Sequence, residues 1–188
     1  MKKLTILAVL TLLTGCATTD IKPSVLKNPP PGKSFNQYAD YVLDPVILAP
    51  AYMDYDANQA AAKKIQENLD MRVNALIAEW KKTPNASSTG TLEFRPTIKQ
   101  IKFINSTARL WSGVMAGSSA VVLIVEIKEK ETGTVIATPE FYNHALGNGF
   151  SLGYNDNMML VHITEQVESY LKDNYAAAVG GPTGKEEE

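Results

Sequence analysis

Cys16 has the most distinctive chemistry in this sequence, because it is the only cysteine among 188 residues. A cysteine acts as a nucleophile through its thiolate. Cys16 follows Lys2, Lys3 and an apolar stretch that runs from Leu4 to Leu13. A positive start, about ten apolar residues and small residues at the break are the layout of a secretory signal. The stretch is about half as long as a membrane-crossing helix needs to be, so the sequence predicts an exported chain.

The four residues Leu13-Thr14-Gly15-Cys16 resemble the lipobox of bacterial lipoproteins. The resemblance implies that residues 1–15 are a lipoprotein signal peptide and that Cys16 becomes a lipidated N-terminus. Three acyl chains would hold the protein on a membrane permanently. Ala17 stands where an aspartate commonly signals inner-membrane retention, so the resemblance implies a periplasm-facing domain on the outer membrane. The alternative is that Cys16 is a chance residue in an ordinary cleaved signal or in a buried N-terminal helix.

A second candidate is the segment from Ala108 to Ser119, which is apolar although it joins two expected strands. Connecting segments are usually polar, so an apolar one is typical of a surface that docks against a partner or lipid. Trp111 and Met115 could instead fold back and close the core. The residues expected to form this interaction loop are Arg109, Leu110, Trp111, Val114 and Met115.

No set of residues predicts catalysis, a metal or a cofactor. Neither His144 nor His162 has a second histidine or a cysteine at ligand spacing. The glycine-rich run 147–153 fails as a dinucleotide fingerprint because Leu152 replaces the third glycine and no βαβ unit surrounds it. The sequence therefore predicts neither catalytic nor metal-binding nor cofactor-binding residues.

Composition excludes several further classes. A net charge of −2 gives no electrostatic footprint for nucleic acid. One cysteine cannot build a disulfide framework or a cysteine-rich zinc site. With 45% hydrophobic and 20% charged residues, the chain has the make-up of an ordinary globular domain.

The chain divides into four parts by composition. Residues 1–15 are the signal, and residues 16–34 contain the lipidated cysteine and a proline-rich tether. Three consecutive prolines, Pro29 to Pro31, favour an extended conformation and hence a spacer. The alternative is an arm packed on the domain. Residues 35–175 form the folded body, and residues 176–188 read as a disordered polar tail.

Periodicity predicts the elements of the body. Apolar residues recur every three or four positions from Ala62 to Trp80, after Asp54 or Asp56 as the cap, and again from Leu160 to Leu171, after Asn155 or Asp156. Strands are expected around Asp44-Pro45, over 92–103, and as a hairpin over 120–138. The order β-α-β-β-β-α predicts an α+β fold in which two amphipathic helices pack on one face of a mainly antiparallel sheet.

The middle of the sequence resembles envelope lipoproteins that carry domains of unknown function. Arg109-x-Trp111-x-Gly113-x-x-x-Gly117, the β-rich run after it, and Glu131-Thr132-Gly133 before an apolar strand resemble the DUF4410 family. Asp44-Pro45-Val46 resembles DUF3313, a rival match. The similarity covers roughly residues 40–172 and transfers no catalytic residue.

Together these features predict a non-catalytic lipoprotein that binds the membrane through its anchor and another envelope protein through its domain. Two alternatives stay open. One is a carrier of a small ligand or lipid, which needs an apolar cavity. The other is an envelope hydrolase, for which perturbed carboxylates should converge in a cleft.

Overall fold

Two long antiparallel strands form the centre of the domain in the computed structural model, which describes residues 21–104, 118–146 and 154–184. Strand β4 covers Thr91–Lys102 and β5 covers Ser118–Glu129. They pair from Leu92↔Glu129 to Lys102↔Ala120, with a bulge between Ile98 and Gln100. The apolar run in β5 marks a central strand, as expected, because neighbours pair with it on both sides.

Each outer position of the sheet is occupied by two short strands in succession. Strands β2 (Asp40–Leu43) and β3 (Ile47–Leu48) both pair with β4 in parallel, and Asp44-Pro45 separates them. Strands β6 (Val135–Ala137) and β7 (Glu140–Leu146) both pair antiparallel with β5. The interruption expected at Pro45 is therefore confirmed, since a proline cannot donate to the ladder.

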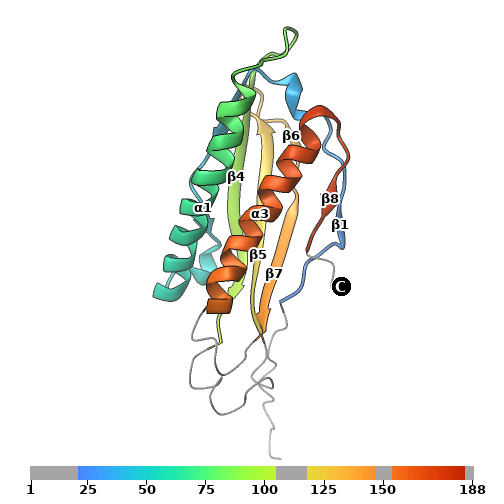
Figure 1. The fold of residues 1–188 in the computed structure, drawn as a ribbon. Coiled ribbons are helices and arrows are strands. Elements are labelled where there is room, and N and C mark those ends of the chain that lie inside the picture. Colours follow the sequence, from blue (N-terminus) through green and yellow to red (C-terminus); the bar gives the residue numbers. More distant parts are fainter. Residues whose placement is uncertain (1–20, 105–117, 147–153, 185–188) are drawn as a thin grey trace, which may run out of the picture.

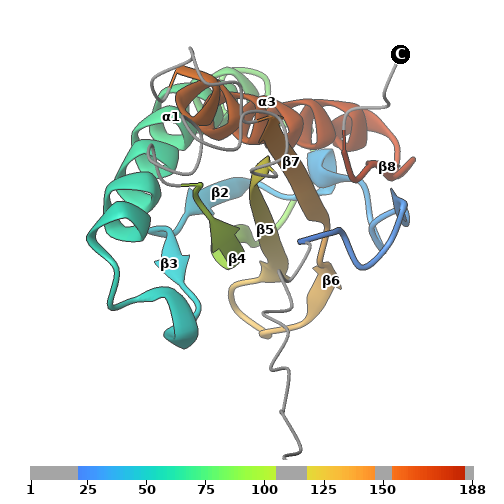
Figure 2. The same cartoon turned by 90° about the horizontal axis from the view of Figure 1, so that it is seen from below.

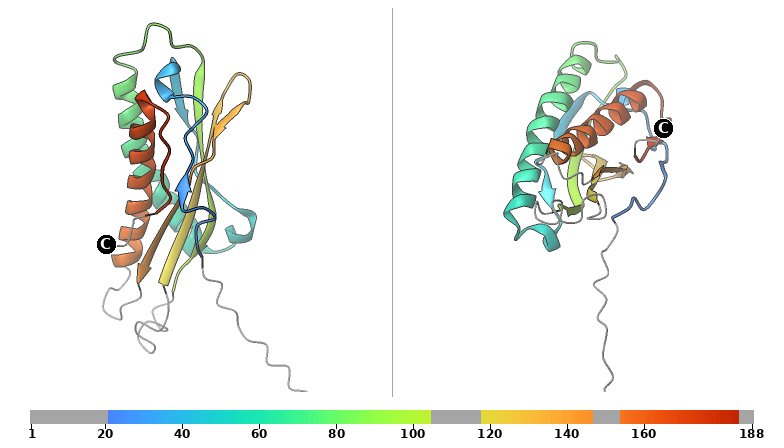
Figure 3. Two further views of the ribbon diagram at one scale, coloured as in Figure 1. Left: turned by 90° about the vertical axis from the view of Figure 1, so that its right-hand side faces the viewer. Right: turned by 60° about the horizontal axis from the view of Figure 1, so that its bottom comes forward.

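Two long helices lie on the same face of this sheet (Figures 2 and 3). Helix α1 covers Asp56–Trp80 and α3 covers Tyr154–Ala176. Their apolar stripes meet the apolar side chains of β4, β5 and β7, so the core lies between helices and sheet. The predicted α+β fold is confirmed: strands precede α1, further strands lie between α1 and α3, and the structure adds β8 after α3. Largest among the fully buried side chains are Phe35, Phe94, Phe141, Ile65, Leu69 and Leu92.

The helix starts differ from the expected ones. The N-cap of α1 is Tyr55, and Asp56 is the first helical residue. In α3 both Asn155 and Asp156 lie inside the first turn, because the helix already begins at Tyr154. A carboxylate in the first turn still favours the helix through its dipole, which explains why these aspartates resemble caps in the sequence.

The proline-rich segment from Ile21 to Ser34 packs on the domain. Of the two possibilities given above, a spacer and a packed arm, the structure has the packed arm. Ile21 packs with Ala120, Val122 and Tyr142 of the sheet. Strand β1 (Lys27–Asn28) pairs with β8 (Gly181–Pro182) beside β7 (Figure 1). We call residues 21–34 the N-terminal arm. The expected tether 16–34 is thus wrong for these residues, because hydrogen bonds and apolar contacts outweigh the solvated extended state of a proline-rich chain.

The C-terminal boundary also needs correction. Helix α3 continues to Ala176, and strand β8 follows it. Both reach into residues 176–188, which the composition predicts to be a disordered tail. Thr183 is buried, and its carbonyl accepts a hydrogen bond from the Tyr142 amide at 2.7 Å. Because this contact covers part of the outer edge of β7, residues 177–183 belong to the folded unit.

Replacing Asn28 by alanine should destabilise the domain by about 1–3 kcal/mol, because buried polar groups would lose their partners. The Asn28 side chain, 1% exposed, donates to the Glu140 carbonyl at 2.8 Å and accepts from the Glu140 amide at 2.8 Å. It also donates to the Pro182 carbonyl at 3.2 Å. Urea unfolding followed by circular dichroism measures the change. Lys27→Ala, one residue away and exposed, is the control, and equal effects would show that the hydrogen bonds of the Asn28 side chain contribute no stability.

Candidate functional site

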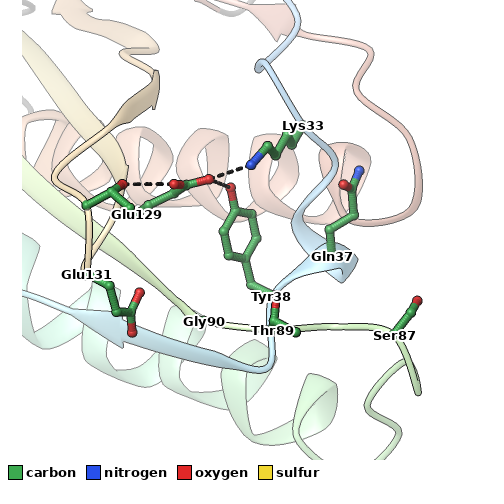
Figure 4. A pocket seen from close by; sticks show the side chains of 9 residues that line it. Lys33, Gln37, Tyr38, Ser87, Thr89, Gly90, Glu129 and Glu131 are labelled. Atoms are coloured by element: carbon green, nitrogen blue, oxygen red, sulfur yellow. Dashed lines mark hydrogen bonds and ion pairs between the residues drawn. The ribbon is translucent and has the colours of Figure 1, made fainter.

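A polar pocket of about 450 Å³ opens at the end of the sheet where β4 begins and β5 ends (Figure 4). Three separate parts of the chain form it: the N-terminal arm with the short helix η1 (Phe35–Gln37), the connection from α1 to β4, and the β5–β6 turn. The residues that line it are Lys33, Gln37, Tyr38, Ser87, Thr89, Gly90, Glu129, Glu131 and Thr132.

Glu129 is the acidic group at the centre of the hydrogen bonds in this pocket. Its carboxylate accepts hydrogen bonds from Lys33 Nζ at 2.6 Å, from the Thr132 hydroxyl at 2.8 Å and from the Tyr38 hydroxyl at 3.0 Å. Donors stabilise the ionised form, so these contacts lower the pKa of Glu129 to about 2. Burial, together with the contact to Glu129, raises the pKa of the Tyr38 hydroxyl, which therefore stays protonated and remains a donor.

Glu131 is the second carboxylate of the pocket. It accepts a hydrogen bond from the Thr91 amide at 3.1 Å, which lowers its pKa. Two perturbed carboxylates thus converge in one cleft, as the hydrolase alternative requires. Both shifts favour the ionised state, however, whereas acid–base catalysis by a pair needs one carboxyl that holds its proton near neutral pH. The geometry suits binding through fixed charges and hydroxyl donors better than proton transfer.

The ionisation of Glu129 gives a test of this arrangement. A glutamate has an ordinary pKa near 4.5, so the ionised Glu129 stabilises the fold fully above about pH 4.5 and loses that contribution as the pH falls toward 2. In Lys33→Ala the pKa of Glu129 should rise toward its ordinary value. Carboxyl-carbon NMR titration measures it, with Lys64→Ala on α1 as the control. An unchanged pKa in Lys33→Ala would contradict the assignment of Lys33 as the main cause.

The face of the sheet opposite the helices carries a network of charged side chains. Residues that alternate with the core positions of β4 and β5 point to this face. Arg95 contacts Asp44 at 3.0 Å, Glu93 at 3.3 Å and Glu126 at 3.8 Å. Lys128 contacts Glu93 at 3.0 Å. Because these charges pair with one another, they give the open face of the sheet a polar surface.

The sequence-predicted site residues all lie outside the described residues. This holds for Cys16 and for the expected interaction loop of Arg109, Leu110, Trp111, Val114 and Met115. The two histidines are described and are not brought together. His144 stacks against Tyr142 with ring centroids 5.7 Å apart, and His162 Nδ1 lies 2.9 Å from Glu165 on the same helix.

Sequence reasoning missed the pocket because its residues are spread over a hundred positions and belong to no motif. Only the turn Glu131-Thr132-Gly133 gave a local signal, and that signal indicated a hairpin rather than a site. Across residues 21–104, 118–146 and 154–184, no three His, Cys, Asp or Glu side chains gather as a metal ion would require. Neither described long helix, α1 or α3, has an apolar run that could span a bilayer.

No model of a known family matches the sequence, so the resemblance to DUF4410 and DUF3313 is not confirmed. The comparison with curated proteins finds no match either.

Three of the similar solved structures are bacterial. The PelC dodecamer from Paraburkholderia phytofirmans is 8% identical, with a TM-score of 0.40 over 70% of this chain and 89% of that one. A DUF330-family protein from Xanthomonas campestris is 10% identical, with a TM-score of 0.44 over 77% and 89%. The minor lipoprotein from Acinetobacter baumannii is 12% identical, with a TM-score of 0.37 over 73% and 94%. Sequence identities and TM-scores this low assign no role to the present chain. Its structural neighbours do include a lipoprotein.

Proposed function

We propose that this protein is a lipid-anchored, non-catalytic binding module on the periplasmic side of the bacterial outer membrane. The observation that carries the proposal is the position of Cys16. The only cysteine in the chain directly follows Leu13-Thr14-Gly15 at the end of an export signal. Lipidation there would leave a short lead of residues before the packed domain begins at Ile21.

The packing of the domain supports a ligand site at its surface rather than in its interior. The space between helices and sheet is filled by fully buried side chains such as Phe35, Phe94 and Met159. The pocket is instead polar and open, and two ionised carboxylates line it. A polar recess beside a paired charge network suits a protein partner with donor groups, which is why we favour another envelope protein as the ligand.

The carrier alternative draws less support from these features. A lipid carrier needs an apolar cavity, whereas the pocket at the Glu129 end is lined mainly by charged and hydroxyl-bearing side chains. The hydrolase alternative rests on Glu129 and Glu131 in one pocket, and it needs one carboxyl that holds its proton, whereas the pKa of both is lowered. Neither alternative accounts for the lipobox better than a binding module does.

Replacing Cys16 by serine tests the anchor. A serine hydroxyl cannot take the diacylglyceryl group, so the variant should lose its acyl chains and its firm attachment to the outer membrane. Membrane fractionation and the mass of the N-terminal peptide measure both effects, with Ser24→Ala as a substitution in the packed arm that keeps the thiol. An unmodified N-terminus in the unsubstituted chain would refute the proposal.

The binding role needs a separate experiment. A photo-crosslinking residue at Gln37, on the pocket rim, should capture an envelope protein in living cells. The same residue at Met71, which is 63% exposed on α1, is the matched control and should give free monomer. Free monomer from both positions would contradict a partner at the pocket.

A further inference from the structure

We propose an orientation of the domain on the membrane. The end of the domain at which β5 begins faces the lipid, and the Glu129 pocket, at the opposite end, points away from it. The inference rests on the proposed lipid anchor and adds the orientation of the domain and the lipid-facing surface. We call this surface the lipid-facing end. It consists of the end of β4, the starts of β5, α1 and α3, and the short helix η2 (Pro50–Tyr52).

The length of the lead sets the first constraint. Five peptide steps separate Cys16 from Ile21, which gives a fully extended reach of roughly 17 Å. Ile21 packs with Ala120 and Val122, near the start of β5. From Val122 the strand continues for seven residues to Glu129, about 23 Å at the usual rise. An acylated Cys16 therefore cannot reach past the pocket end, so this end cannot rest on the bilayer.

The contacts of the N-terminal arm keep the lead short. Residues after Ile21 could lengthen the lead only if they left the domain, and their buried contacts would then break. The amide and hydroxyl of Ser24 both donate to the Glu140 carboxylate, whose side chain is only 6% exposed. Lys99 Nζ lies 3.2 Å from the same carboxylate and donates to the Ser24 hydroxyl at 2.9 Å. Further along, Asn28 is fixed to Glu140 and Pro182. Peeling the arm away would break the hydrogen bonds that Ser24 and Asn28 make with Glu140 and would take the buried Asn28 side chain from its partners.

The chemistry of the lipid-facing end fits a membrane surface. Large apolar or amphipathic side chains are exposed where α1 and α3 begin: Met53, Tyr55 as the N-cap of α1, and Tyr154 as the first residue of α3. Tyrosine side chains favour the membrane–water interface, because the ring is apolar and the hydroxyl stays hydrated. The open face of the sheet instead carries the paired charges of Arg95 and Lys128, which would have to be desolvated against lipid.

Depth-dependent quenching tests the orientation. The mature lipidated chain carries no free thiol, because Cys16 is blocked, so a single added cysteine can hold a fluorophore. Lys102→Cys places it at the lipid-facing end, Lys130→Cys at the pocket end and Thr97→Cys on the open face. Each protein is reconstituted into phosphatidylethanolamine–phosphatidylglycerol vesicles that contain lipids with a nitroxide on the headgroup. The label at 102 should lose most of its fluorescence, whereas the labels at 130 and 97 should keep nearly all of theirs.

Other quenching patterns overturn the inference. Strong quenching at 97 would mean that the domain lies on its open face, strong quenching at 130 would mean that it is inverted, and equal quenching would mean that it tumbles freely. Flotation with the vesicles is measured first on the unlabelled chain. A chain that does not float refutes the anchor itself, whereas a chain that floats with one of these three patterns refutes only the orientation.

Discussion

Replacing Phe94 by alanine is expected to destabilise the domain by about 3–5 kcal/mol, the largest effect foreseen for a single core side chain. Phe94 lies on β4 and is fully buried. Its ring meets Phe35 edge-on, with centroids 6.1 Å apart, and lies parallel to Tyr41 at 6.4 Å. Since these partners come from different segments, the cavity left by the substitution would loosen η1 and β2 together.

Urea unfolding followed by far-ultraviolet circular dichroism measures this loss. Small domains have a total stability of about 5–15 kcal/mol, so the variant should unfold at a much lower urea concentration. Met71→Ala on the exposed side of α1 is the control and should change the free energy of unfolding by less than about 0.5 kcal/mol. A loss below about 1 kcal/mol for Phe94→Ala would contradict the tight packing described for this site.

Replacing Gly180 by alanine is expected to open the β1–β8 pair. Gly180 has a φ of +75°, a conformation that costs an L-residue about 1–2 kcal/mol. An added Cβ would also lie 2.4 Å from the Asn28 carbonyl oxygen and 2.9 Å from the backbone of Pro29 and Pro30. Backbone atoms cannot move aside as a flexible side chain can, so the two strands must separate.

Gly133→Ala is the matched control for this substitution. Gly133 has nearly the same φ, +71°, but an added Cβ there meets nothing within 4 Å. The difference between the two variants therefore isolates the backbone overlap. Hydrogen exchange should show lost protection at the Tyr142 amide, which donates to Thr183, in Gly180→Ala but not in Gly133→Ala. Equal protection in both variants would show that the C-terminal segment tolerates the Cβ.

Local patterns were sufficient to predict the helices and the central strands. The apolar residues of α1, from Ile65 to Trp80, recur with the helical period over many turns, so one face had to be buried. The unbroken apolar run of β5 required neighbours on both sides, and the turn Glu131-Thr132-Gly133 required a hairpin. These elements depend on short stretches of sequence, and the α+β arrangement follows from their order.

Long-range contacts were beyond such reasoning. Nothing near Asn28 indicates that it bonds to Glu140, 112 positions later, or to Pro182. Consecutive prolines favour an extended chain, and an extended chain can be a solvated spacer or a strand-like arm with equal local geometry. The pocket depends on the same contacts, because Lys33 and Tyr38 reach Glu129 only once the arm is in place.

The pairing of Asn28 with Pro182 also fixes the order in which the chain can finish folding. Asn28 lies near the start of the described domain and Pro182 near its end, so the arm cannot complete its contacts until β8 is in place. A chain cut after Gly180 should therefore lose the β1–β8 pair and the contact of Asn28 with Pro182, while the hydrogen bonds from Ser24 and Asn28 to Glu140 remain.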